Sequence, residues 1–145
     1  MSRIAILALM IAMFCGTTLG QQSAEFNSYF SDKRYDFRLT HEELLGTPAW
    51  LEDEPNPPLS PRTADRVALN YLRILFDNAS DWRLDEIKLV PVGERWVYVV
   101  QFTPPPPPNC YDCMTTPFNV LVTMNGKAVT AVISRWKSPT SSVNE

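Results

Sequence analysis

The stretch SPRTADRVALNYLRILFDN, residues 60–78, predicts the long helix around which the rest of this chain is arranged. Ser60 is a preferred N-cap residue, and Pro61 suits the first helical position because its missing N–H would have no intrahelical partner there. Apolar residues recur at steps of three and four and define one face: Ala64, Val67, Ala68, Tyr71, Leu72 and Leu75. This spacing predicts an amphipathic helix that buries that face against a sheet.

After the helix the pattern changes to that of β-strands. Residues 87–92 alternate, and Pro91 favours an edge strand there. Residues 95–102, RWVYVVQF, are rich in aromatic and β-branched side chains. The runs PFNVLVTM and AVTAVISRW flank Asn125-Gly126, a strong hairpin signal in which both residues adopt positive φ. We therefore predict an α+β domain over residues 60–136, with one helix packed on a four-stranded antiparallel meander.

Residues 21–59 predict an irregular, extended N-terminal arm. Within it, YDFRL is compatible with a short strand, and THEELLG predicts one helical turn with a capping box from Thr40 and Glu43. The proline-rich part that follows carries Trp50 and Leu51, which we expect to anchor the arm to the core. Because residues 95–102 are apolar on both sides, the arm with Trp50 is the candidate cover for the second face of the sheet. Residues 137–145 predict a disordered tail.

The N-terminus has the pattern of a signal peptide. Arg3 precedes an apolar run over residues 4–14, which is shorter than the roughly 20 residues that span a bilayer. Thr18 and Gly20 are small residues before Gln21, so residues 1–20 predict a cleaved signal and an exported protein, periplasmic or secreted. A lipoprotein cut before Cys15 is the less favoured alternative. No second long apolar run follows, so we expect no membrane span in the mature chain.

The charge balance argues against a nucleic-acid partner. Thirteen Lys and Arg residues stand against sixteen Asp and Glu residues, for a net charge of −3, and no basic stripe is present. No glycine-rich phosphate loop or other cofactor motif occurs, so no cofactor is predicted. The sequence leaves the oligomeric state and the identity of a peptide or protein partner open.

The stretch TPPPPPNCYDCM, residues 103–114, is the most unusual of the chain. In an oxidising compartment a lone cysteine pair forms a disulfide by default, which predicts a bond between Cys110 and Cys113. Five prolines before it form a stiff polyproline segment without N–H donors. Together they fix a small loop that projects Tyr111, with Asp112 beside it, as the candidate binding loop.

Two other uses of the cysteines remain as alternatives. A redox C-x-x-C normally begins a helix, which lowers the pKa of the first thiol, whereas Pro117 and the threonines here leave no room for one. Zinc needs four ligands, and the mature chain offers Cys110, Cys113 and His41 as Cys and His side chains. We therefore predict no metal site and no catalytic residue, with a thiol-disulfide or metal-handling protein as the alternative.

The order of helix and strands resembles that of the small exported domains of the PepSY and cystatin-like types. The segment PPLSPRTA, the W-x-Y-x-V pattern and the Asn-Gly hairpin are also similar to uncharacterised exported proteins of planctomycete-type bacteria. The resemblance implies a non-catalytic binding or inhibitory module. The cystatin Q-x-V-x-G loop is absent, because the corresponding turns are PVGERW and TMNGKA. The sequence thus predicts a small exported binding or accessory module for a peptide, protein or envelope component.

Overall fold

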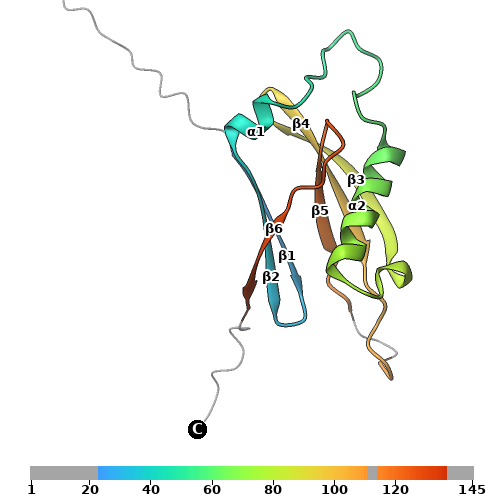
Figure 1. Ribbon diagram of the computed structural model, residues 1–145. Coiled ribbons are helices and arrows are strands. Elements are labelled where there is room, and N and C mark those ends of the chain that lie inside the picture. The colour runs from blue at the N-terminus through green and yellow to red at the C-terminus, as the bar shows by residue number, and fades with distance from the viewer. Residues whose placement is uncertain (1–22, 111–113, 137–145) are drawn as a thin grey trace, which may run out of the picture.

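The computed structural model describes residues 23–110 and 114–136, and its α+β class agrees with the prediction. Its elements are β1 (Ala24–Phe30), β2 (Lys33–Leu39), α1 (His41–Leu45), α2 (Pro61–Leu75), η1 (Ala79–Asp81), β3 (Arg83–Val92), β4 (Arg95–Thr103), β5 (Phe118–Thr123) and β6 (Ala131–Arg135) (Figure 1). The predicted signal peptide and the predicted tail lie outside the described residues. Among the helices that are described, none has the length and apolar character needed to cross a bilayer.

The strands form two antiparallel sheets of three strands each, so the predicted four-stranded meander is wrong. Sheet A has the order β1-β2-β6, and sheet B has the order β3-β4-β5 (Figure 1). The strands predicted at residues 87–92 and 95–102 pair in sheet B as expected, and β3 is an edge strand. The fourth predicted strand, β6, leaves β5 and pairs with β2, with Phe37 opposite Ala131.

The Asn125-Gly126 turn reverses the chain after β5, as predicted, but β6 does not continue beside β5. Gly126 has a φ of 76°, but Asn125 is not in the positive region, in contrast to the prediction. The N–H of Gly126 donates to the carbonyl of Thr123 at 2.9 Å, and the N–H of Thr123 donates to the carbonyl of Lys127 at 2.9 Å. A bridge between Val122 and Ala128 and a hydrogen bond from the N–H of Val129 to the carbonyl of Leu121 at 2.8 Å follow, after which the chain crosses to sheet A.

Residues 24–39 form the β1–β2 hairpin instead of the predicted irregular arm. The turn is made by Ser31 and Asp32, and Ser31 has a φ of 59° where glycine is usual. Tyr35, Phe37 and Leu39 of β2 are buried, as the YDFRL pattern suggested, with Phe37 fully enclosed, and Asp36 between them is buried as well. The arm therefore contributes a hairpin to the same core, and residue 59 is not the boundary of a separate unit.

Helix α2 begins and packs as its sequence predicts. The hydroxyl of Ser60 accepts a hydrogen bond from the N–H of Thr63 at 3.2 Å, and Pro61 is the first helical residue. Ala64, Ala68 and Leu72 are fully buried against the sheets, whereas Ile74 is 79% exposed. Tyr71 extends from the same face to sheet A, where its hydroxyl accepts from the N–H of Ala131 at 2.8 Å.

An aromatic cluster lies where both sheets and the end of α2 meet. Phe118 of β5 is fully buried at its centre. Its ring lies 5.0 Å from that of Tyr35 and 5.3 Å from that of Phe76, both in edge-to-face geometry. Trp82 stacks on Phe76 at 4.7 Å. Such pairs stabilise the fold by about 0.5–1.5 kcal/mol each beyond the burial of apolar area. The cluster therefore helps to join the two sheets to each other and to the end of α2.

The side chain of Ser28 joins the edges of the two sheets. Ser28 of β1 is 2% exposed, and its hydroxyl accepts from the N–H of Asn119 at 2.8 Å. The same hydroxyl donates to the carbonyl of Asn119 at 3.2 Å. Strands β1 and β5 are not paired by a ladder, so Ser28 satisfies the outward groups of β5 at this point.

Both faces of β4 are covered, as its apolar sequence predicts. Val97 and Tyr98, on opposite sides of the strand, are both buried. Trp50 anchors the segment between α1 and α2 as expected, with its ring 5.4 Å from that of Trp96 in β4. Leu51 is 57% exposed, so its predicted role as an anchor is wrong.

Candidate binding groove

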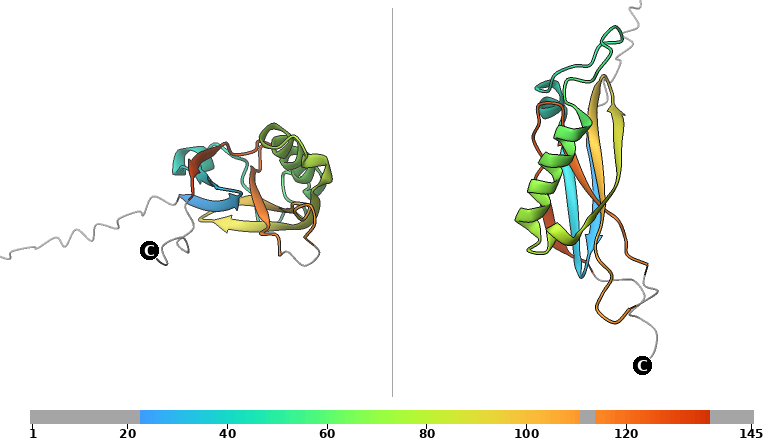
Figure 2. Two further views of the ribbon diagram at one scale, coloured as in Figure 1. Left: turned by 90° about the horizontal axis from the view of Figure 1, so that it is seen from below. Right: turned by 90° about the vertical axis from the view of Figure 1, so that its right-hand side faces the viewer.

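A groove of about 780 Å³ lies between the β1–β2 turn and the connection after β4. These two segments lie at the same end of the molecule (Figure 2). The groove is bounded by segments far apart in the sequence, which fold together because β6 returns to sheet A. The described residues that line it are Tyr29, Phe30, Ser31, Asn78, Pro104, Pro105, Pro106, Pro107, Pro108, Met114, Thr115, Thr116 and Trp136.

One wall of the groove is the run Pro104–Pro108 that follows β4. Prolines carry no backbone N–H, so this segment cannot continue the ladder of sheet B and offers only carbonyl acceptors. The run ends in a turn, where the N–H of Cys110 donates to the carbonyl of Pro107 at 3.2 Å and Asn109 has a φ of 67°. The wall is therefore stiff and lacks hydrogen-bond donors of its own.

Aromatic side chains form the other wall. The rings of Tyr29 and Trp136 meet edge to face with centroids 4.8 Å apart. Trp136 follows β6 directly, and its N–H donates to the carbonyl of Asp32 at 2.7 Å, which fixes it beside the β1–β2 turn. The Trp136 residue remains 38% exposed, and Met114 near it is fully exposed. These side chains present apolar surface to solvent.

Among the described lining residues, none carries a formal charge and none is a histidine or cysteine. Polar groups come from Ser31, Thr115, Thr116 and Asn78, and the Asn78 side-chain oxygen already accepts from the Trp82 indole at 3.3 Å. General acid–base and nucleophilic catalysis rely mostly on carboxylates, imidazoles, amines and thiols. The groove as described is therefore built for apolar contact and hydrogen bonding.

The described segments on either side of the predicted binding loop line this groove. Tyr111, Asp112 and Cys113 lie outside the described residues, so the loop itself stays a prediction. Cys110 is described and is bonded rather than a free thiol. Its pairing with Cys113 stays a prediction, since that residue is not described.

The aromatic wall is not evident from the sequence. Tyr29 belonged to a segment predicted to be irregular, and Trp136 was assigned to a strand beside β5. Nothing local in the sequence shows that the two residues meet, because the contact depends on the pairing of β6 with β2. The sequence offers one signal, a large aromatic residue, Trp136, at the end of the last predicted strand.

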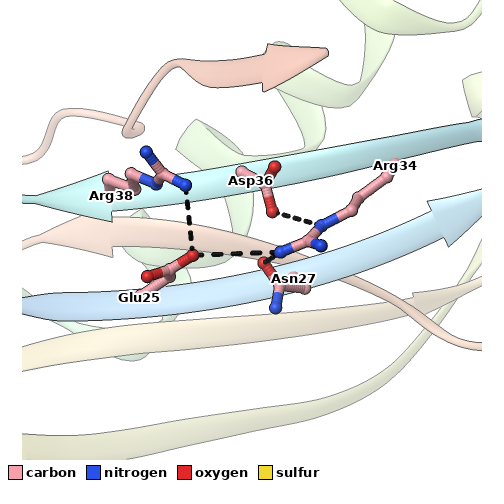
Figure 3. A network of polar contacts seen from close by, with 5 residues as sticks. All are labelled: Glu25, Asn27, Arg34, Asp36 and Arg38. Atoms are coloured by element: carbon pink, nitrogen blue, oxygen red, sulfur yellow. Dashed lines mark hydrogen bonds and ion pairs between the residues drawn. The ribbon is translucent and has the colours of Figure 1, made fainter. Parts of the chain in front are cut away.

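A network of charged residues covers the outer face of sheet A (Figure 3). Arg34 bonds to Asp36 at 2.6 Å and to the side-chain oxygen of Asn27 at 3.2 Å, and the hydrogen bond to Asp36 raises the pKa of Arg34. Glu25 lies 3.9 Å from Arg34 and 3.4 Å from Arg38. Two cations face two carboxylates, so the network is balanced and contributes to strand pairing rather than to a site.

A second hollow of about 410 Å³ lies beneath α1 and is lined in part by Arg38, Glu43 and Lys127. Glu43 is already engaged there, because its carboxylate accepts from the backbone N–H and the hydroxyl of Thr40 at 2.8 and 2.9 Å. Over residues 23–110 and 114–136, no three His, Cys, Asp or Glu side chains come together to hold a metal ion.

Comparisons with known proteins find no matching family model, no similar curated protein and no similar solved structure. The resemblance to PepSY and cystatin-like domains therefore stays a prediction.

Proposed function

We propose that the protein is a small exported module that binds an extended, uncharged segment of a peptide, protein or envelope component in the groove between Pro104–Pro108 and Trp136. The observation that carries the proposal is the composition of the groove. Aromatic rings and prolines line it, charged groups are absent from its described lining, and it is formed by segments held in place by both sheets. The proposed module has no catalysis of its own.

The chemistry of the two walls indicates how a ligand would bind. The proline carbonyls accept hydrogen bonds from ligand N–H groups, and the rings of Tyr29 and Trp136 offer faces for aliphatic or aromatic side chains. Polyproline segments lose little conformational freedom on binding because they are already stiff. This preorganisation favours affinity from a small contact area.

Selection from a displayed peptide library tests the proposal. The full chain is expressed, purified and immobilised, and the library is selected on it and counter-selected on the Thr116→Arg variant. Thr116 is exposed in the groove, so arginine there adds bulk and charge without disturbing the core. Thr130→Arg is the matched control, because Thr130 is exposed and lines the second hollow instead.

Enriched peptides are then titrated into the labelled protein and followed by NMR. We expect shifts at the Trp136 indole, Ser31 and Thr115, equal affinity for the Thr130→Arg control, and affinity at least about ten-fold weaker for Thr116→Arg. Failure to enrich any peptide over the Thr116→Arg variant would overturn the proposal. So would shifts confined to residues outside the groove.

Export is the second part of the proposal and has its own test. The mature N-terminus should be Gln21, which mass spectrometry of the protein recovered from its native host establishes. Intact Met1 in the mature protein would contradict export through a cleaved signal, and a lipid-modified Cys15 would favour the lipoprotein alternative.

A further inference from the structure

Sheet A ends in β1 and β6, and sheet B ends in β3 and β5. Strands β1 and β5 lie beside each other, joined through Ser28, so β3 and β6 are the outer edge strands, and these two differ. Edge strand β3 carries Pro91, a register shift between Leu84 and Glu86, and charged side chains along its length. Proline, bulges and charges are the devices by which proteins keep edge strands from pairing with other chains. Strand β6 pairs with β2 without a register shift and contains no proline and no acidic residue. Within the described part of the chain, no strand pairs with its other edge.

The hydrogen bond from Ala131 to Tyr71 shows which backbone groups of β6 point toward that edge. In an antiparallel ladder, successive residues point their N–H and C=O groups alternately toward one neighbouring strand and the other. The Ala131 N–H donates to the Tyr71 hydroxyl instead of to β2. On the other side, the Trp136 N–H donates to Asp32 at the β1–β2 turn. The N–H and C=O groups of Ile133 and Arg135 are therefore directed outward, beyond the position that Tyr71 occupies.

The same strand exposes apolar side chains on both faces. Val132 is 61% exposed and Ile133 is 49% exposed. A strand added beside β6 would cover both, because neighbouring strands lie about 4.8 Å apart. The edge thus offers main-chain groups and apolar surface to the same occupant.

Charge indicates the chemistry of that occupant. Lys33 lies directly opposite Arg135 in the ladder, and both side chains are exposed. Like charges in directly opposite positions destabilise a pair of strands. Neither cation makes an ion pair with a residue that the structure describes. A carboxylate on an added strand would relieve this repulsion.

We propose that the open edge of β6 binds an extended acidic segment of another protein, which adds to sheet A as a further strand. Its backbone pairs with Ile133 and Arg135, and its carboxylate lies beside Arg135 and Lys33. A second copy of this chain, pairing through β6, is a poorer occupant, because β6 contains no acidic residue that could lie beside Arg135 and Lys33. This surface is separate from the uncharged groove, and its proposed partner is acidic, whereas the proposed ligand of the groove is uncharged.

Two capped synthetic peptides test the proposal: Thr-Val-Glu-Val-Glu-Thr and the same sequence with lysine in place of glutamate. Each is titrated into the purified protein, expressed as the full chain, with backbone amides followed by NMR. We expect the acidic peptide to shift the amides of Ile133 and Arg135 and to bind at least about ten-fold more tightly than the lysine peptide at low salt. Its affinity should fall as the salt concentration rises.

Two variants separate the backbone contribution from the charge. Ile133→Pro removes an outward N–H that is not part of the β2–β6 ladder, so the protein should stay folded. Its affinity for the acidic peptide should be about ten-fold weaker or more, because one backbone hydrogen bond to the peptide is lost. The double variant Lys33→Glu, Arg135→Glu should reverse the preference toward the lysine peptide. Thr116→Arg should leave binding at this edge unchanged, which distinguishes it from the groove.

Three results would overturn the inference. The first is equal binding of the two peptides by the native protein, and the second is unchanged affinity in the folded Ile133→Pro variant. The third is self-association that depends on protein concentration and is abolished by Ile133→Pro, because it would assign the edge to a second copy of the chain.

Discussion

Replacing Ser28 with alanine is expected to loosen the join between the two sheets. The Ser28 hydroxyl makes two hydrogen bonds to the backbone of Asn119, at 2.8 and 3.2 Å, in a position that is 2% exposed. Alanine fits the space but leaves the N–H and C=O of Asn119 without that partner. A hydrogen bond contributes about 0.5–1.5 kcal/mol net, so two predict a loss of about 1–3 kcal/mol in the free energy of unfolding.

Urea titrations of the native protein and the variant measure this loss, and hydrogen exchange at the Asn119 amide locates it. The slope of the free energy of unfolding against urea concentration should stay the same, because the surface area exposed on unfolding hardly changes. Ser134→Ala, at an exposed position of β6, is the matched control and should cost less than about 0.5 kcal/mol. A loss below about 0.5 kcal/mol for Ser28→Ala, or unchanged exchange at Asn119, would refute the view that this hydroxyl joins the sheets.

Three further predictions concern the helices and the cysteine loop. Leu72→Ala should cost about 2–5 kcal/mol and Ile74→Ala less than about 0.5 kcal/mol in the same titration, and equal costs would contradict the orientation of α2. Hydrogen bonds from Thr40 hold the pKa of Glu43 below its ordinary value of 4.5. The ionised Glu43 carboxylate therefore stabilises the folded protein above about pH 4.5, and this stabilisation is lost as the pH falls through the lowered pKa. Glu43→Gln should therefore flatten the acid limb of the stability curve, and parallel curves for the two proteins would contradict this. Cys110→Ser should cost no more than about 2 kcal/mol, the chain-entropy figure for a four-residue loop; two free thiols in the native protein, counted by mass spectrometry, would contradict a bond to Cys113 and favour the thiol-disulfide alternative.

The elements that the sequence predicted correctly are those with local signals. Ser60 and Pro61 mark the start of α2, and the same face of that helix is buried in the structure. Thr40 and Glu43 form the capping box that their spacing indicated. In each case the stabilising contact lies within a few residues, so a single sequence contains it.

Strand β1, and with it the hairpin, was missed because two of its inward positions carry small side chains. Ala24 and Ser28 are buried at positions where a long apolar side chain would have marked a strand. Ser31 takes a positive φ without the glycine that normally announces such a turn. The reason for a serine at position 28 lies across the molecule, at Asn119, and no local pattern could show it.

The candidate site was predicted only in part, for the same reason. The run Pro104–Pro108 was conspicuous in the sequence and does form one wall of the groove. The opposite wall depends on β6 pairing with β2, whereas the Asn125-Gly126 turn suggested that β6 would stay beside β5. A turn specifies that the chain reverses, but the choice of neighbour depends on which strand offers the better buried face.

The pairing of β2 with β6 sets the order in which the protein can assemble. Residue 33 lies opposite residue 135, so the sheet contains strands from nearly both ends of the described chain. Closing so long a loop costs entropy before any contact compensates it, which slows folding. During synthesis on a ribosome, the hairpin β1–β2 would emerge early and would lack its third strand, β6, until synthesis is almost complete. Sheet B and α2 lie between the two partners in sequence, so they are free to form first and to serve as the template on which the chain ends meet.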